Sequence, residues 1–212
     1  MKYDLHIHSK YSGDSILEPE DIVKLAIKRG LGGVAITDHN TIKGGMKAKQ
    51  FETGDFDVIV GSEILTDKGE VMGLFLSDEI PPGSMHDVVA DIRGQDGIVV
   101  IPHPFDEFRK NALFPAEEDV SLIDAVEGFN SRCLVHSRNE QAVEFAAQHN
   151  LSITAGSDAH LAREIGKAGI IIDSEEPREA IIRNNVRIFG KRTSILNQAG
   201  TKAIKLWRKI KQ

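Results

Sequence analysis

Histidine and carboxylate side chains recur at short spacings in the first 160 residues of the chain. His6 and His8 are two residues apart, and Asp158 and His160 repeat that spacing much later. Side chains two apart on an extended strand point to the same side, so each pair has the geometry to chelate one metal ion. One such pair is often chance, but two of them in one chain predict a metal site.

Glu63, His103 and Asp38 extend this set. Glu63 follows an apolar run, where a buried carboxylate would be costly unless a cation such as a bridging metal lay beside it. His103 lies between two prolines that restrict the backbone and could hold the imidazole in place. Asp38 would face away from its neighbour His39 on a continuing strand, which suits a role in orienting a ligand histidine. The remaining histidines lie at predicted helix ends and are excluded: His86, His136 and His149.

These residues follow predicted strands. Short apolar, β-branched runs alternate with longer segments of helical period, which is typical of βα units with a mostly parallel sheet. We count seven runs, at residues 3–6, 34–37, 58–60, 98–101, 125–129, 153–155 and 169–172. Carboxyl ends of parallel strands share one face, so the residues at the strand ends should converge there. These are His6, His8, Asp38, His39, Glu63, His103, Asn130, Asp158 and His160.

Helices and one hairpin are predicted between the runs. Helical patterns cover residues 19–29, the stretch after a cap at Ser84, and residues 139–149. The turn at residues 67–69 predicts a hairpin within residues 63–76, and residues 104–119 look like an irregular loop partly packed over the site. The pattern favours an α/β barrel of about seven βα units, although an open doubly wound sheet gives nearly the same pattern.

Composition indicates a soluble, folded, single domain. The 212 residues are 41% hydrophobic and 27% charged, close to ordinary globular proteins. No apolar run approaches the roughly 20 residues needed to span a bilayer, and the start has no apolar signal-peptide core, so we expect a cytoplasmic protein with no membrane contact. The single cysteine, Cys133, cannot form an internal disulfide and is interpreted as a structural bystander.

Charge is distributed unevenly along the chain. The net charge is −6, yet residues 180–212 contain nine lysines and arginines and no acidic residue. A basic tail of this kind could touch phosphates or an acidic surface. The simpler interpretation is a solvated closing helix over residues 201–212.

Five short motifs, in this order, resemble those of the PHP (polymerase and histidinol phosphatase) superfamily. They are Asp4-Leu5-His6-Ile7-His8-Ser9, Thr37-Asp38-His39-Asn40, Gly61-Ser62-Glu63, Pro102-His103-Pro104 and Gly156-Ser157-Asp158-Ala159-His160. The resemblance spans residues 4–160. It implies a distorted (β/α)7 barrel, similar to a TIM barrel, that fills residues 1–200 as one domain and carries two or three metal ions that hydrolyse phosphoesters.

The resemblance also divides the ligands among three metals. His6, His8, Glu63 and Asp158 would hold the first, Glu63 and His103 the second, and Asp14, His39 and His160 the third. The chain departs from the family pattern at Asp14, where histidine is common, and at Asn130, where histidine or cysteine is common. Because a neutral amide is a weak ligand, we expect two tightly held ions and one labile ion. Nitrogen and oxygen ligands without thiolate fit Mn, Fe or Zn.

A filled site would attract a phosphate and lower the pKa of bound water, so that a metal-bound hydroxide becomes the nucleophile. We expect Asp38, Glu63 and His160 to take part in catalysis. Arg109 and Arg132 are placed where a guanidinium could bind a second phosphate, with Asn130 beside them.

Three functions are weighed. The segment at residues 127–132 resembles that of short PHP members acting on nucleotides or short oligonucleotides, so we favour a phosphoesterase for such a substrate, with no obligate protein partner. The first alternative is histidinol-phosphate phosphatase. The second is a metal-stabilised nucleic-acid-binding module led by the basic tail. We consider it the weaker alternative, because a protein that only binds has little physical reason to bring so many metal ligands to one face.

Overall fold

Strands of one sheet curl around a common interior in this computed structural model. It describes residues 1–173, 176–194, 197, 200, 201, 203, 204, 206 and 208. Within these residues the strands follow the order β7-β6-β5-β4-β3-β2-β1-β8-β9. Their bounds are β1 (Lys2–Ile7), β2 (Gly33–His39), β3 (Asp57–Leu65), β4 (Glu70–Leu74), β5 (Ile98–Ile101), β6 (Ala125–Asn130), β7 (Ser152–Gly156), β8 (Ala168–Ile171) and β9 (Arg187–Gly190).

The barrel closes between β1 and the chain that follows β7. Ile7 forms a parallel bridge with Ala159, and the His8 amide donates to the Ala159 carbonyl over 2.9 Å. At its other end β1 pairs with β8, where Tyr3 lies opposite Ile170. The expected α/β barrel in a single domain is therefore confirmed, as a nearly closed barrel.

The pairing differs from the expected mostly parallel sheet. The ladders β1–β2, β2–β3, β5–β6 and β6–β7 are parallel, whereas β4, β8 and β9 pair antiparallel. A parallel neighbour needs a crossover of a dozen or more residues. The connection from β3 to β4 is the predicted hairpin at residues 66–69, and that from β7 to β8 carries one short 3-10 helix, η4 (Ala162–Glu164).

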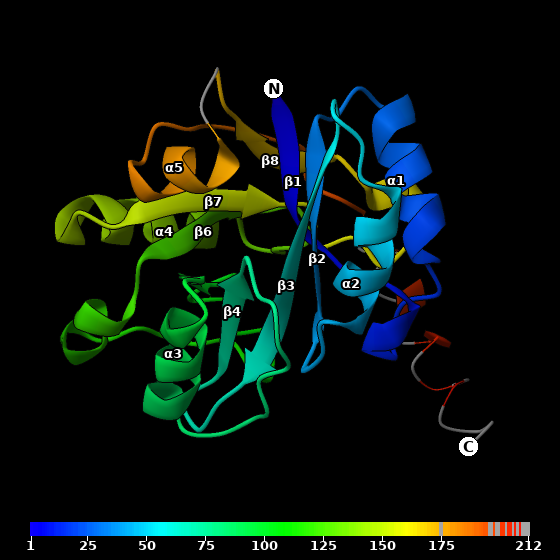
Figure 1. Cartoon of the computed structure of the whole chain (residues 1–212). Helices are drawn as coiled ribbons and strands as arrows, with labels where there is room; N and C mark the ends of the chain where they lie inside the picture. Colours follow the sequence, from blue (N-terminus) through cyan, green and yellow to red (C-terminus); the bar gives the residue numbers. More distant parts are fainter. Residues whose placement is uncertain are drawn as a thin grey trace.

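Helices cover the outside of the barrel, with α1 (Pro19–Lys28) and α2 (Lys43–Ala48) on one side in Figure 1 and α3 (Met85–Gly94), α4 (His136–His149) and α5 (Pro177–Ile182) on the other. α1 begins at a proline and buries Ile22, Val23 and Ala26. The Ser84 side chain caps α3 by accepting from the Asp87 amide. The three predicted helices are confirmed, although α4 begins three residues earlier than expected.

The chain between β5 and the 3-10 helix η3 (Glu117–Leu122) contains no regular element, as the sequence predicts. In the closing segment, Arg208 donates to the Lys10 carbonyl over 2.6 Å. The other basic residues expected there, together with Trp207, lie outside the described residues: Lys202, Lys205, Lys209 and Lys211. None of the helices formed by the described residues is long and apolar enough to cross a bilayer.

Candidate metal centre

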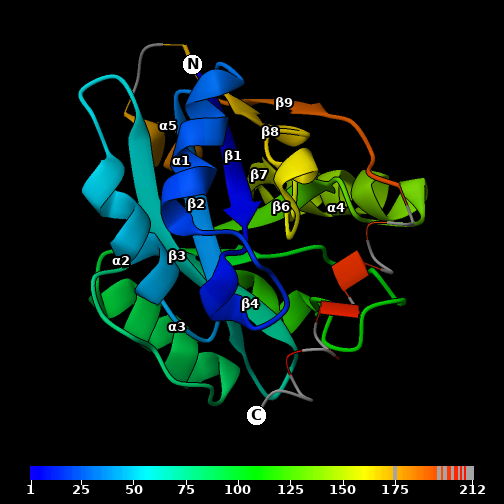
Figure 2. The ribbon, with the colours of Figure 1, turned by 90° about the vertical axis from the view of Figure 1, so that its right-hand side faces the viewer.

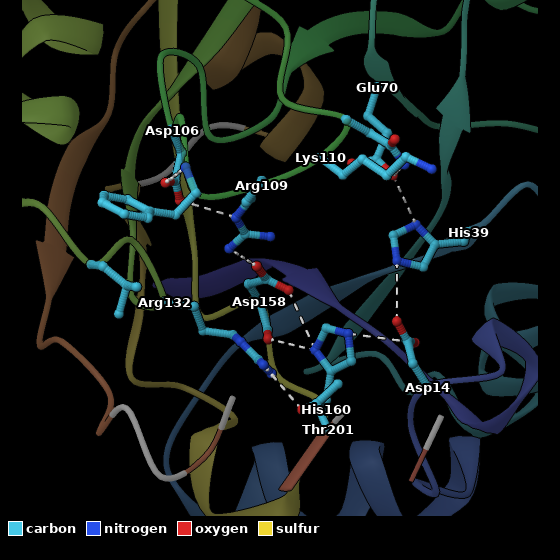
Figure 3. Close-up of a pocket in the computed structure, with 13 residues that line it drawn as sticks. Asp14, His39, Glu70, Asp106, Arg109, Lys110, Arg132, Asp158, His160 and Thr201 are labelled. Atoms are coloured by element: carbon cyan, nitrogen blue, oxygen red, sulfur yellow. Dashed lines mark hydrogen bonds and ion pairs between the residues drawn. The ribbon is translucent and has the colours of Figure 1, made fainter. Parts of the chain in front are cut away.

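The chemically reactive side chains meet at one end of the barrel. Strands β1, β2, β3, β5 and β7 each bring a histidine or carboxylate to it at or just after their carboxyl ends. β4 runs antiparallel, so its first residue, Glu70, reaches the same end. Figure 3 shows part of this cluster from the pocket side. The predicted convergence therefore occurs, with β4 as an additional contributor.

Glu63 lies at the centre of the cluster. Its Oε2 atom is 3.2 Å from His39 Nδ1, 3.3 Å from His8 Nε2 and 3.5 Å from His6 Nε2. Its Oε1 atom is 2.7 Å from His103 Nε2. One buried carboxylate thus lies beside four imidazoles from three segments of the chain, as a bridging ligand would.

Asp14 and Asp158 occupy the flanks. The Asp14 oxygens lie 3.4 Å from His39 Nε2 and 3.4 Å from His160 Nε2. Asp158 Oδ1 lies 3.4 Å from His8 Nε2 and 3.4 Å from His160 Nδ1. Four overlapping sets each have ligand atoms within 4.8 Å of one another: His8, Asp14, His39 and His160; His6, His8 and Asp158; His6, Glu63 and His103; and His39, Glu63 and Glu70.

Three buried oxygen atoms point to bound cations. Asp14 Oδ1, Glu63 Oε2 and Asp158 Oδ1 accept no hydrogen bond within the described structure, although imidazole nitrogens surround them. Leaving a buried carboxylate oxygen unsatisfied is costly. Cations held between the oxygens and imidazoles would remove that cost, and this nitrogen and oxygen donor set fits Mn, Fe or Zn. The residues present therefore fit the metals that the sequence implies.

Charges within the cluster strongly lower the pKa values of two carboxylates, Glu63 and Asp158. Burial alone would raise the pKa of Glu63, but the charges of His39 and His6 hold it well below its usual range. The pKa of Asp158 is likewise held far below its usual value, because Arg109 and His6 outweigh burial. Both carboxylates therefore remain ionised.

The imidazoles respond in opposite directions. Burial and the nearby charge of His160 lower the pKa of His8 to about 3, which keeps that ring neutral and able to ligate. For His39 the carboxylates of Glu63 and Asp14 outweigh burial and raise the pKa to about 9. Protons on such rings occupy the position that metal ions would take.

Glu127 holds the cluster from behind. Its Oε1 atom is 3.0 Å from His6 Nδ1, and its Oε2 atom accepts from the His103 amide over 2.8 Å. This leaves His6 Nε2 facing Glu63. Sequence reasoning missed both Glu127 and Glu70 as members of the site. The available signal for Glu127 was an ionisable residue inside an apolar strand, which is costly to bury without partners.

The backbone is strained at two of the predicted ligands. His103 has φ 32° and Asp158 has φ 53°, in the left-handed region that disfavours residues with a Cβ. Such conformations persist where the surrounding structure demands them and often mark functional sites.

Asp38 differs from the expectation. Its carboxylate accepts hydrogen bonds of 2.6 Å from the Ser9 amide and of 2.6 Å from the Ser9 hydroxyl, instead of contacting an imidazole. Burial raises its pKa to about 6. Because side chains alternate along β2, Asp38 points away from His39, and it fixes the residue that follows His8.

A pocket of about 380 Å³ opens beside the cluster, lined by Arg109, Arg132, Asp158 and His160 among others. Arg109 donates to Asp158, and Arg132 donates to Thr201 over 3.0 Å (Figure 3). Arg109 also donates to Asn130 Oδ1 over 3.2 Å. Asn130 is fully buried and lies outside the pocket lining. The expected contact of Asn130 with substrate is therefore replaced by a bracing role behind Arg109.

Comparisons with known proteins identify related sequences. A family model described as PHP-associated matches residues 136–187. An uncharacterized protein of Methanocaldococcus jannaschii is 46% identical over 143 residues, which is 62% of this chain and 82% of that protein.

Two solved structures share the fold. A two-domain protein of Bacteroides vulgatus containing a predicted PHP-like metal-dependent phosphoesterase superimposes with a TM-score of 0.75 at 20% identity, covering 90% of this chain. This chain spans only 65% of that protein's length. An amidohydrolase of Chromobacterium violaceum gives a TM-score of 0.64 at 15% identity, with 88% and 98% coverage.

Proposed function

Because the chain belongs to the PHP superfamily of metal-dependent hydrolases, we propose that it hydrolyses a phosphate ester of a nucleotide or short oligonucleotide. The observation that carries this proposal is the Glu63 carboxylate, surrounded by four imidazoles, with buried oxygens of Asp14 and Asp158 nearby that accept no hydrogen bond. A hydrolytic metal site requires this density of ligands next to an open pocket.

Two or three divalent ions are part of the proposal. The residues that would hold them are His6, His8, Asp14, His39, Glu63, His103, Asp158 and His160. When bound, such ions would neutralise charge on the phosphate and make water a better nucleophile.

Arg109 supports recognition of a phosphate. Its guanidinium is about one-quarter exposed, and Asp106 and Asp158 hold it at the pocket. A guanidinium already fixed in place binds phosphate oxygens with little further loss of entropy. Arg132 also lines the pocket and would bind the same group or a second phosphate.

Phe108 supports a nucleotide as the rest of the substrate. Its ring lines the same pocket and is 64% exposed. An exposed aromatic ring beside phosphate-binding residues provides a surface on which a base can stack.

His160 also lines the pocket and is positioned to contact substrate. Glu63 is buried and does not line the pocket, so it acts as a metal ligand.

The test is hydrolysis of a panel of phosphoesters with added Mn, Fe or Zn. The panel contains nucleoside monophosphates, 3′,5′-bisphosphates, short oligonucleotides and histidinol phosphate. We expect turnover of a nucleotide or oligonucleotide by the wild type and loss of activity in Asp158→Ala. The control is Glu140→Ala, at an exposed ion pair on α4.

If only histidinol phosphate is hydrolysed, the nucleotide substrate is wrong and the chain is a histidinol-phosphate phosphatase. If no phosphoester turns over with any metal, the proposed activity is wrong. Circular dichroism of each variant excludes unfolding as the cause of a loss.

A further inference from the structure

A second groove, of about 390 Å³, lies outside the metal centre. All of its lining side chains are hydrogen-bond donors and none is a carboxylate: Arg163, Lys167, Arg192, Thr193, Ser194 and Asn197. Three of them are cations on a chain whose net charge is −6. This composition is suited to an anion such as a phosphate group.

The cations of this basic groove have no acidic partner among the described residues. No carboxylate in the described part of the chain lies within 4.0 Å of Arg163, Lys167 or Arg192. Some other arginines lie beside acids: Arg178 lies 2.7 Å from Asp96, and Arg187 lies 2.9 Å from Asp173. The groove is therefore a local centre of positive charge.

The basic groove shares a wall with the active-site pocket. Arg132, in the pocket, donates to Thr201, and the Thr201 hydroxyl donates to the Asn197 carbonyl over 3.2 Å. On the groove side, Arg163 Nε donates to Asn197 Oδ1 over 2.7 Å. A second link is the bond from Arg192 to the carbonyl of Leu134, which lines the pocket. Anions bound in the two cavities would be neighbours.

We propose that the basic groove binds the phosphodiester backbone of a single-stranded oligonucleotide whose reacting phosphate ester lies in the active-site pocket. The inference rests on the proposed function and selects the oligonucleotide over the mononucleotide. A mononucleotide fills only the pocket, whereas an oligonucleotide carries further phosphates that reach the adjoining cations. Backbone contacts of this kind provide affinity without reading base sequence.

The test is binding of a fluorescein-labelled six-nucleotide strand to the full chain in EDTA, followed by fluorescence anisotropy at several salt concentrations. Lys167→Glu is the variant, and Lys47→Glu on α2 (Figure 2) is the matched control, because Lys47 is an exposed lysine that does not line the groove. We expect Lys167→Glu to raise the Kd about tenfold and to reduce the slope of log affinity against log salt by about 1. Lys47→Glu should bind like the wild type.

Three results would contradict the proposal that the groove binds the oligonucleotide backbone. They are unchanged affinity in Lys167→Glu, an equal loss in Lys47→Glu, or full displacement of the strand by equimolar inorganic phosphate, which would make the groove a site for free phosphate. Activity separates this proposal from the previous one. If the strand binds through Lys167 but no phosphoester is hydrolysed, only the proposed hydrolytic activity is wrong. If oligonucleotides are hydrolysed with the same KM by wild type and Lys167→Glu, only the proposed role of the groove is wrong.

Discussion

Single residues behind the metal centre determine how its ligands point. Glu127 contacts His6 Nδ1 at 3.0 Å and receives hydrogen bonds from the His103 amide and from Asn130 Nδ2, the latter over 2.9 Å. A carboxylate on the far nitrogen of a ligand imidazole fixes its orientation and raises its basicity.

Glu127→Gln should therefore weaken metal binding about 10- to 100-fold, because the amide keeps the shape but loses the charge. Titration of the apoprotein with Mn by calorimetry measures the effect. Glu140→Gln, at an exposed helix position, serves as the matched control. An unchanged metal affinity in Glu127→Gln would show that the residue only fills space.

Cys133 is a residue whose chemistry the fold suppresses. Burial raises the pKa of its thiol to about 11, so the folded chain holds the proton through mildly alkaline pH. This rise of about two pKa units lowers the thiolate fraction at pH 8 about a hundredfold. Because the unfolded thiol ionises near pH 9, this group's contribution to stability is present below that pH and declines as pH rises towards 11.

We expect Cys133 to react with a thiol reagent at pH 8 at least a hundredfold more slowly in the folded chain than in urea. Reactivity should rise with pH until about 11. Equal rates in the folded and denatured chain would contradict the buried, protonated thiol.

At the scale of elements, α2 must approach the ends of β1 and β2 closely. Gly44, in its first turn, leaves the necessary space, since a Cβ there would lie 1.9 Å from Asp38 Oδ2 and 2.2 Å from Ser9 Oγ. These atoms hydrogen-bond each other and are buried, so they cannot move away freely.

Gly44→Ala should lower the free energy of unfolding by about 1–3 kcal/mol through overpacking. Gly94→Ala is the control, because a Cβ at the end of α3 meets nothing within 4 Å and alanine favours a helix by up to about 1 kcal/mol. Urea denaturation measures both variants. Equal stability of the two would show that α2 relaxes outward without cost.

At the scale of the molecule, metals would join segments that are distant in the sequence. The ligand groups draw on β1, β2 and β3 and on the residues after β5 and β7. Ions that bind only the folded chain stabilise it in proportion to the logarithm of their concentration over Kd.

Adding Mn at about 100 times its Kd should stabilise the fold by about 2.7 kcal/mol for each ion bound. For a chain of 212 residues, this raises Tm by about 5–10 °C. Thermal denaturation with Mn and with EDTA measures the shift, and Asp158→Ala should show much less of it. The absence of any shift in the wild type would contradict a folded metal centre.

Much of this architecture could be predicted from the chain itself. Apolar periodicity and turn residues locate α1, α3, the β3–β4 hairpin and most strands, because these signals are local. The spacing in His6-Ile7-His8 and Asp158-Ala159-His160 identifies candidate ligands, because side chains two residues apart on an extended strand point to the same side. The convergence of these pairs could be inferred from the rule that parallel strands share a face.

Only the tertiary structure decided the remaining features. Glu70 reaches the cluster because β4 runs antiparallel, and Glu127 lies behind His6 and His103 because β6 runs beside β5. Asp38 turns to Ser9, and Asn130 is buried behind Arg109. The adjacency of the basic groove to the pocket depends on contacts between residues 58 and 69 positions apart, namely Arg192 with Leu134 and Arg132 with Thr201. Local sequence determines which groups are available, but contacts between distant segments require strand order and side-chain direction, which no short stretch of sequence contains.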